Sequence, residues 1–214
     1  MIFLRAGRLA LVLALAVLAA GPLYPGEPRT LEGRVEKVFD GDTIRVRLDS
    51  GEREVVRFLG VDTPESYARR YGYVEFLGTE SSKFIQDQLS GKRVRLTAGF
   101  RGDTVERDRY RRILAFVYHE NRDICALLVE KGLARVYRKS PSPRHDELVK
   151  LETAARDAGL GIWNTAAEKD FYRSQFRENR NRHLVLWFWD NDREFLKSIM
   201  CGDDKNRGAS PALP

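Results

Sequence analysis

Cysteine and histidine are scarce in this chain, which has two cysteines and three histidines among 214 residues. Their positions match none of the spacings by which these residues bind zinc, so the sequence gives no reason to expect a zinc enzyme. Cys125 and Cys201 are consistent with one disulfide in an oxidising compartment. Cys125 also lies inside the apolar run Ile124–Val129, and we favour the interpretation that it is a small buried side chain.

An apolar run long enough to cross a membrane is also missing. The longest run, Leu9–Ala20, has 12 residues, whereas a membrane-spanning helix needs about 20. It follows Arg5 and Arg8 and ends in small residues, which is the order found in a secretory signal peptide. We predict a signal peptide over residues 1–21 and an exported protein that is periplasmic, secreted or envelope-anchored. An uncleaved anchor is the alternative, and only this would bring the protein into contact with a membrane.

The chain also lacks a strong excess of positive or negative charge in its central part. The net charge is +6, but residues 31–163 carry 25 basic and 22 acidic side chains. Net charge alone therefore does not predict a nucleic-acid partner, and such a prediction must come from local clusters of charge. The composition, with 43% apolar and 32% charged residues, is typical of a folded globular chain.

The periodicity of apolar residues predicts a small β-barrel with helices. Strands are expected at residues 31–39, 43–48, 54–59, 92–98 and 112–118, and helices at 79–89, 124–131 and 144–158. Short strands with one intervening helix favour a closed antiparallel barrel, hence an α+β fold that is mainly β. We divide the remaining chain into a linker (22–30), one domain (31–163) and a C-terminal extension of unknown role (164–214).

Two short runs combine carboxylates with turn formers: Asp40–Thr43 and Arg57–Glu65. Asp42 and Asp62 each follow a predicted strand, and neighbouring strands of a barrel would bring them together. Two like charges at short distance raise a pKa unless a cation lies between them, and oxygen ligands favour Ca²⁺ or Mg²⁺ over zinc. Taken alone, Asp40–Thr43 is better explained as a plain turn, because Asp-Gly is a common turn pair.

Glu65 and Arg57 extend this candidate site. Pro64 fixes a bend, and Glu65 projects from the same loop one residue later. A carboxylate there can orient or deprotonate a metal-bound water. Arg57 lies at the other end of the run, where it could bind a phosphate or form an ordinary surface salt bridge.

Two basic segments suggest contact with nucleic acid. Arg107–Arg112 contains four arginines, and guanidinium groups bind phosphate through paired hydrogen bonds without losing their charge at neutral pH. The alternative is a solvated loop. In Ser66–Tyr73, basic residues alternate with tyrosines, which suits a surface that stacks on bases. The alternative is that these tyrosines pack in the protein.

The motifs occur in an order that matches a known family. The chain resembles the staphylococcal nuclease-like (thermonuclease) domain over residues 31–163. The matching runs, in chain order, are Asp40–Thr43, Arg57 with Val61–Glu65, Gly78–Glu80, Asp108–Arg112, Leu128 with Gly132–Ala134, and Gly159–Trp163. Any one of these runs is unspecific, whereas six in the correct order are highly specific.

The resemblance implies a five-stranded OB-fold barrel with about three helices, and calcium-dependent hydrolysis of phosphodiester bonds in DNA and RNA. By motif position it implies that Asp42 and Asp62 bind Ca²⁺ through their carboxylates, and Thr63 through its backbone carbonyl. Glu65 would act as general base on the attacking water, or would only position it. A metal, a base and two guanidinium groups form a complete set for phosphoryl transfer.

The resemblance also implies how the substrate is bound. Arg57 and Arg112 would bind the scissile phosphate and stabilise the pentacoordinate transition state. The side chains expected to contact the nucleotide are Arg109, Tyr110 and Tyr137. The expected partners are DNA and RNA, with no obligate protein partner, and the protein is expected to be a monomer.

The chain departs from the family pattern at Arg111, where a glycine or another small residue is usual. A shift of register could direct Arg111, instead of Arg112, toward the phosphate. We assign the role to Arg112 because it directly precedes the apolar strand, as the motif expects.

Two other functions are compatible with the sequence. A catalytically silent module that binds nucleic acid or protein could share the fold, but such a module is expected to lose a charged residue of the site. This chain keeps all five of them: Asp42, Asp62, Glu65, Arg57 and Arg112. An envelope-anchored structural protein would explain residues 1–20 and the apolar run Leu184–Trp189, but it leaves these five residues unexplained.

Overall fold

The computed structural model describes residues 27–67, 73–139, 142–179 and 192–200. The predicted signal segment, Leu184–Trp189 and Cys201 lie outside these residues. Five strands form the body of the domain: β1 (Glu27–Asp40), β2 (Thr43–Leu48), β3 (Arg53–Phe58), β5 (Arg93–Arg101) and β7 (Ile113–His119). Two-residue strands accompany them: β4 (Val61–Asp62), β6 (Thr104–Val105), β8 (Arg122–Asp123) and β9 (Arg135–Val136).

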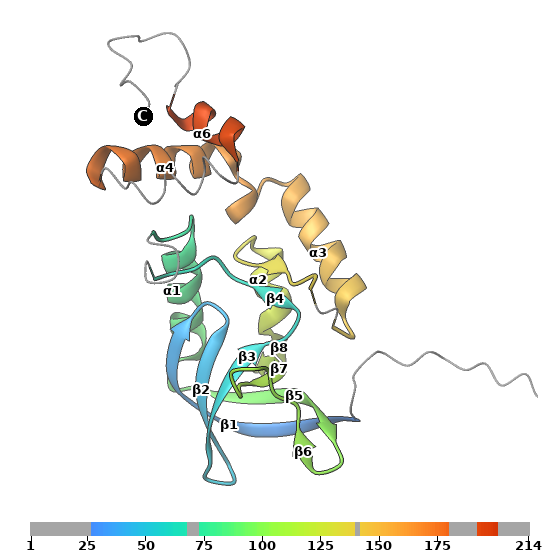
Figure 1. Ribbon diagram of the computed structural model, residues 1–214. Helices are drawn as coiled ribbons and strands as arrows, with labels where there is room; N and C mark the ends of the chain where they lie inside the picture. The colour runs from blue at the N-terminus through green and yellow to red at the C-terminus, as the bar shows by residue number, and fades with distance from the viewer. Residues whose placement is uncertain (1–26, 68–72, 140–141, 180–191, 201–214) are drawn as a thin grey trace, which may run out of the picture.

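The five longer strands close into a barrel (Figure 1). Antiparallel pairs join β5 to β1, β1 to β2 and β2 to β3. β3 pairs with β7 in parallel, and antiparallel pairing of β7 with β5 completes the circle. The predicted α+β class and the five-stranded OB-fold barrel are therefore confirmed. The expectation of a wholly antiparallel barrel is wrong at one pair, because β3 and β7 run parallel.

Three helices of the domain lie where the sequence predicts them: α1 (Gly78–Leu89), α2 (Ile124–Glu130) and α3 (His145–Asp157). α2 begins where the carboxylate of Asp123 accepts a hydrogen bond from Ala126 N at 2.9 Å, as an N-cap does. After a 3₁₀ turn (Gly161–Trp163), the C-terminal extension contributes α4 (Thr165–Asn179) and α6 (Arg193–Met200). Among the described helices, none combines the length and apolar character needed to cross a membrane.

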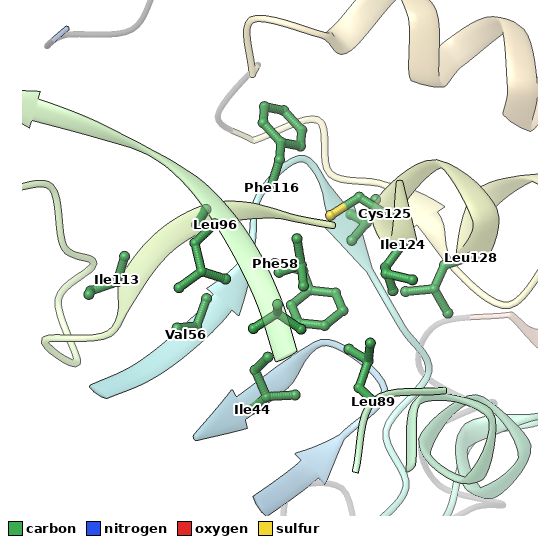
Figure 2. Close-up of a cluster of buried hydrophobic side chains, with 14 of the residues drawn as sticks. Ile44, Val56, Phe58, Leu89, Leu96, Ile113, Phe116, Ile124, Cys125 and Leu128 are labelled. Carbon is green, nitrogen blue, oxygen red and sulfur yellow. The ribbon is translucent and has the colours of Figure 1, made fainter. Parts of the chain in front are cut away.

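The apolar faces of the strands fill the barrel together with side chains of α1 and α2 (Figure 2). Ile44, Val46 and Leu48 alternate inward along β2, as the sequence predicts. Cys125 is a free and fully buried thiol in this core, and burial raises its pKa to about 12. Cys125 therefore acts as a small core side chain, as we favoured from the sequence.

β1 begins four residues earlier than the sequence predicts, at Glu27. Residues 27–30, which the sequence places in the linker, pair with residues 97–100 of β5. Pro28 makes this segment resemble a linker, since proline cannot donate to a sheet. The strand forms because β5 extends to Arg101 and offers a partner, which the local sequence of β1 does not reveal.

A second, smaller cluster of buried side chains lies outside the barrel. It consists of Tyr73, Phe76, Tyr172, Leu196 and Ile199. Through it, α4 and α6 pack against the segment that leads into α1, and Figure 1 shows both helices on the α1 side of the barrel. The burial of Tyr73 shows that it packs in the protein and is not part of a base-stacking surface. Tyr67 of the same loop is exposed, and Arg69–Tyr71 lie outside the described residues.

Candidate active site

The turn between β1 and β2 brings Asp42 against the loop that follows β4. A side chain at Gly41 would overlap Thr63, so this close approach requires a glycine. The buried carboxylate of Asp42 accepts hydrogen bonds from Thr63 N at 3.0 Å, Thr63 Oγ1 at 3.1 Å and Thr43 Oγ1 at 3.1 Å. The Asp-Gly pair thus forms a turn, and the same turn fixes a carboxylate.

Arg57 joins the two carboxylates that the sequence predicts as metal ligands. It lies opposite Thr43 in the β2–β3 pair. Its guanidinium contacts the Asp42 carboxylate and donates to Asp62 Oδ1 at 2.7 Å. Only 14% of the Arg57 side chain is exposed, so it does not form an ordinary surface salt bridge. Because one guanidinium contacts both carboxylates, Asp42 and Asp62 converge as predicted.

Negative charge is concentrated around this turn. Burial, followed by the charge of Asp42, raises the pKa of Asp40 to about 6. Burial also raises the pKa of Asp62, although the Arg57 guanidinium opposes the shift. Both shifts have the direction expected where burial and a neighbouring carboxylate disfavour the charged form more than nearby arginines stabilise it.

Arg112 reaches the same turn from the loop before β7. The backbone of Arg111 is left-handed, with φ +66°, which accounts for the small residue usual at that position in the family pattern. Asp108 accepts hydrogen bonds from Arg112 N at 2.9 Å and from Arg112 Nε at 2.7 Å. A guanidinium nitrogen of Arg112 donates to Thr43 Oγ1 at 3.3 Å. The guanidinium of Arg112 therefore contacts the site, as its motif position implies.

Arg107 fixes the loop that carries Arg112. Its guanidinium donates to the Glu54 carboxylate at 2.8 and 2.7 Å and to the backbone carbonyl of Arg111 at 2.8 Å. Within the predicted phosphate-binding cluster, Arg107 is thus a structural residue.

Tyr110 is an exposed aromatic side chain beside the site. The residue is 63% exposed, and the guanidinium carbons of Arg109 and Arg112 lie 4.8 and 5.4 Å from the centroid of its ring. An aromatic ring between guanidinium groups is suited to contact with a base and its phosphate. Tyr137, which follows β9, is partly buried, and its backbone N donates to Gly60 O at 2.9 Å beside β4.

Glu65 is held through its backbone by Glu75. Glu75 Oε2 accepts a hydrogen bond from Glu65 N at 2.7 Å, and Glu75 N donates to the Glu65 carbonyl at 3.0 Å. A side chain at Gly78 would overlap the same carbonyl, so α1 must begin with a glycine. Sequence reasoning missed Glu75, because its role depends on contacts ten residues away and no motif marks it.

Arg135 is a second residue of the site without a signal in the sequence. It lies opposite Asp62 in the β4–β9 pair. Burial raises the pKa of Glu168 in α4, and the positive charge of Arg135 opposes that shift. The positive charge of Arg135 also opposes the rise in the pKa of Asp62 and of Glu75. This arginine therefore links the carboxylates of the site electrostatically to the C-terminal extension.

The donors that the sequence predicts for a cation are two carboxylates and one backbone carbonyl. In the part of the chain that the structure describes, no three histidine, cysteine, aspartate or glutamate side chains form a group that could hold a metal. The predicted set of ligands has only two such side chains, because its third member, Thr63, would contribute a main-chain oxygen. Asp42 and Asp62 offer only carboxylate oxygens as ligands, and the Arg57 guanidinium contacts both carboxylates. This donor set fits a hard divalent cation such as Ca²⁺.

Comparison with known proteins identifies the family of the chain. The model of the staphylococcal nuclease homologue family matches residues 55–165. The chain belongs to this family. Endonuclease YncB of Bacillus subtilis (strain 168) is 31% identical over 148 residues, which cover 68% of each chain. The thermonuclease of Staphylococcus hyicus is 36% identical over 132 residues, which cover 61% of this chain and 75% of the relative.

The staphylococcal nuclease homologue match does not cover the whole structure. It begins in β3 and ends at Thr165, the first residue of α4. It therefore includes Arg57, Asp62, Glu65 and Arg112. The turn of Asp42 precedes it, and nearly all of the two C-terminal helices follow it.

Proposed function

We propose that this protein is a nuclease that hydrolyses phosphodiester bonds of DNA and RNA with a bound calcium ion. The observation that supports this most directly is the meeting of two carboxylates and two arginines at one turn, where Arg57 contacts Asp42 and Arg112 contacts Thr43. Family membership and similarity to proteins named endonuclease and thermonuclease agree with it. The signal-like pattern of residues 1–21 leads us to propose that it is exported.

Asp42, Asp62 and Thr63 would hold the cation. When bound, the cation supplies positive charge to the phosphate oxygens and lowers the pKa of a bound water. The three hydrogen bonds to Asp42 fix its carboxylate before any ligand binds. The Asp62 side chain is 52% exposed, so the site is open to solvent and substrate on that side.

Arg57 and Arg112 bind the scissile phosphate. They contact adjacent residues of one turn but come from different elements, β3 and the loop before β7. Guanidinium groups that are fixed in advance stabilise the charge developing on the pentacoordinate phosphate without reorganisation. Arg57 is largely buried, so its charge is weakly screened by solvent.

Glu65 acts on the attacking water. Its carboxylate can take the proton of the water, or orient the water for attack on phosphorus. The backbone on both sides of its Cα is held by Glu75, which restricts where the carboxylate can go. Tyr110, flanked by Arg109 and Arg112, contacts the nucleotide next to the scissile bond.

The test is the degradation of single-stranded DNA by the purified protein. We expect cleavage with added Ca²⁺ and none in excess chelator. Asp42→Asn, which keeps the size of the side chain but removes one ligand charge, should lose most of the activity. The matched control is Asp49→Asn, because Asp49 follows β2 and pairs with Arg93 on the surface.

Two results would contradict the proposal. Equal cleavage in Ca²⁺ and in chelator would exclude the role of the cation. A folded wild-type protein that binds DNA but does not cut it in Ca²⁺ would favour a catalytically silent binding module.

A further inference from the structure

We propose that the C-terminal helices α4 and α6 are a positioning part of the active site, because they hold the segment that fixes Glu65. The segment consists of residues 73–78 and is called here the Glu75 segment. The inference rests on the proposed nuclease function for its effect on catalysis, but the contact it describes can be tested without activity.

The first step is the connection between Glu65 and the Glu75 segment. Glu65 is hydrogen-bonded on both sides of its Cα, through N to Glu75 Oε2 and through its carbonyl to Glu75 N. Gly78 packs against the same carbonyl with no room for a side chain. The position of the Glu65 backbone therefore depends on the position of the Glu75 segment.

The second step is the contact between the Glu75 segment and α4. The hydroxyl of Tyr172 accepts a hydrogen bond from Phe76 N at 3.2 Å, in a buried environment. Burial raises the pKa of Tyr172 to about 12, so this hydroxyl stays neutral at physiological pH. The rings of Phe76 and Phe171 lie 5.5 Å apart. One backbone hydrogen bond and an aromatic contact thus attach the residue after Glu75 to α4.

The third step is the stabilisation of α4 by α6. Leu196 and Ile199 of α6 are buried in the same cluster as Tyr172. Arg173 Nε donates to the carbonyl of Ile199 at 3.2 Å, and another nitrogen of its guanidinium donates to the carbonyl of Ser198 at 3.1 Å. These carbonyls belong to the last turn of α6, where backbone oxygens lack partners within the helix. The two helices therefore form one unit against the Glu75 segment.

The C-terminal extension also interacts electrostatically with residues of the site. Glu168 of α4 lies within the electrostatic reach of Arg135 and Glu75. Arg135 in turn lies opposite Asp62. The family match ends at Thr165, so these contacts come from a part of the chain that the family model does not include.

The main test compares Tyr172→Phe with Tyr118→Phe in the full-length protein. Each change removes one hydroxyl that accepts a hydrogen bond. The donor is Phe76 N for Tyr172 and Arg144 for Tyr118, which lies on β7 and makes no contact with the Glu75 segment among the hydrogen bonds between described residues. We expect Tyr172→Phe to lower kcat about tenfold with little change in KM, since a small misplacement of a catalytic group is costly. Tyr118→Phe should leave both constants within about twofold of the wild type. Equal effects of the two changes on kcat would overturn the proposal.

A double-mutant cycle shows whether the effect passes through Glu65. In a Glu65→Gln background the catalytic carboxylate is already absent, so adding Tyr172→Phe should cause no further loss of kcat. A further tenfold loss in that background would mean that Tyr172 acts on the structure in general, and would overturn the positioning role.

Two variants of Glu75 separate hydrogen bonding from charge. Glu75→Gln keeps an oxygen that can accept from Glu65 N, and we expect it to retain most of the activity. Glu75→Leu removes this acceptor and should lower kcat at least as much as Tyr172→Phe. Equal losses in both variants would show that charge and not position is important, which contradicts the proposal.

Hydrogen exchange at the Glu65 amide tests the contact without any measurement of activity. We expect Tyr172→Phe to accelerate this exchange, and Tyr118→Phe to leave it unchanged. If the wild type proves inactive, the proposed function fails, and this measurement alone decides whether α4 holds the Glu75 segment. Unchanged exchange in Tyr172→Phe would overturn the proposal, as would faster exchange with unchanged kcat.

Discussion

The two sides of the candidate site are supported in different ways. On one side, Asp42, Arg57 and Arg112 lie at the ends of barrel strands or directly before one, above a continuous apolar core. On the other side, Glu65 lies in a loop, and its backbone is held by Glu75 and by the second cluster outside the barrel.

This difference separates most of the proposed binding residues from the proposed general base. Asp42, Arg57 and Arg112 lie in barrel strands or directly beside them, whereas Asp62 and Thr63 lie in β4 and in the loop that continues to Glu65. The proposed general base depends on a smaller set of contacts, which a separate pair of helices completes. Smaller cooperative units open at lower free energy than a main core, so the position of Glu65 is the more adjustable part of the site.

The largest effect should follow from removing a guanidinium on the barrel side. We expect Arg57→Ala to lower kcat/KM for single-stranded DNA by about 10²–10³-fold, because one fixed donor to the transition state is lost. Arg93→Ala is the matched control, since Arg93 also pairs with two carboxylates, Asp49 and Glu32, but on the exposed surface. Similar activity of the two variants in a cleavage assay would contradict the assignment of Arg57.

Loss of packing should affect the two clusters differently. Phe58→Ala in the barrel should lower the free energy of global unfolding by about 3–5 kcal/mol, measured by urea denaturation. Leu196→Ala in the second cluster should cost about 2–4 kcal/mol and act locally, so hydrogen exchange should accelerate in α4 and α6 but not in β2 or β3. If both changes shift one common transition equally, the two regions form a single cooperative unit, and the distinction drawn between them is wrong.

The smallest expected effect is the change in stability when the charge of Asp40, beside Asp42, is removed. The folded-state pKa of Asp40 is raised to about 6, from an unfolded value of about 3.9. Its ionisation at neutral pH therefore opposes folding, and this contribution disappears as the pH falls below the unfolded pKa. We expect Asp40→Asn, measured in chelator, to raise the free energy of unfolding by about 1–2 kcal/mol at pH 7 and to have little effect near pH 3.5. A destabilised variant at pH 7 would contradict the direction of the shift.

Much of the barrel side could be predicted from the sequence, because its motifs are local. Asp42 and Asp62 each follow a predicted strand, and Arg112 directly precedes an apolar strand. The predicted ends of strands place such residues near one another once the strands close into a barrel. The contacts of Arg57 with both carboxylates follow from the register of β2 and β3, which the sequence does not specify.

The Glu65 side was less predictable, because its contacts join distant parts of the chain. Tyr172 is separated from Phe76 by 96 residues, and no pattern around either residue indicates the pairing. For the same reason, the sequence left open whether Tyr73 packs in the protein or belongs to a base-stacking surface. An alternation of tyrosine with basic residues is compatible with an exposed surface and with a packed one, and the presence of α4 and α6 decides between them.

The sequence by itself determined the barrel, its three helices and the residue types of a phosphodiester-cleaving site. These depend on periodicity, turn formers and short motifs, which are properties of neighbouring residues. Only the tertiary structure decided that the guanidinium of Arg112 contacts the turn, that Arg107 is structural, and that α4 and α6 contact the segment holding Glu65. Each of these features depends on contacts between elements that are distant in sequence. Such contacts, and their free energy, exist only when the chain has folded.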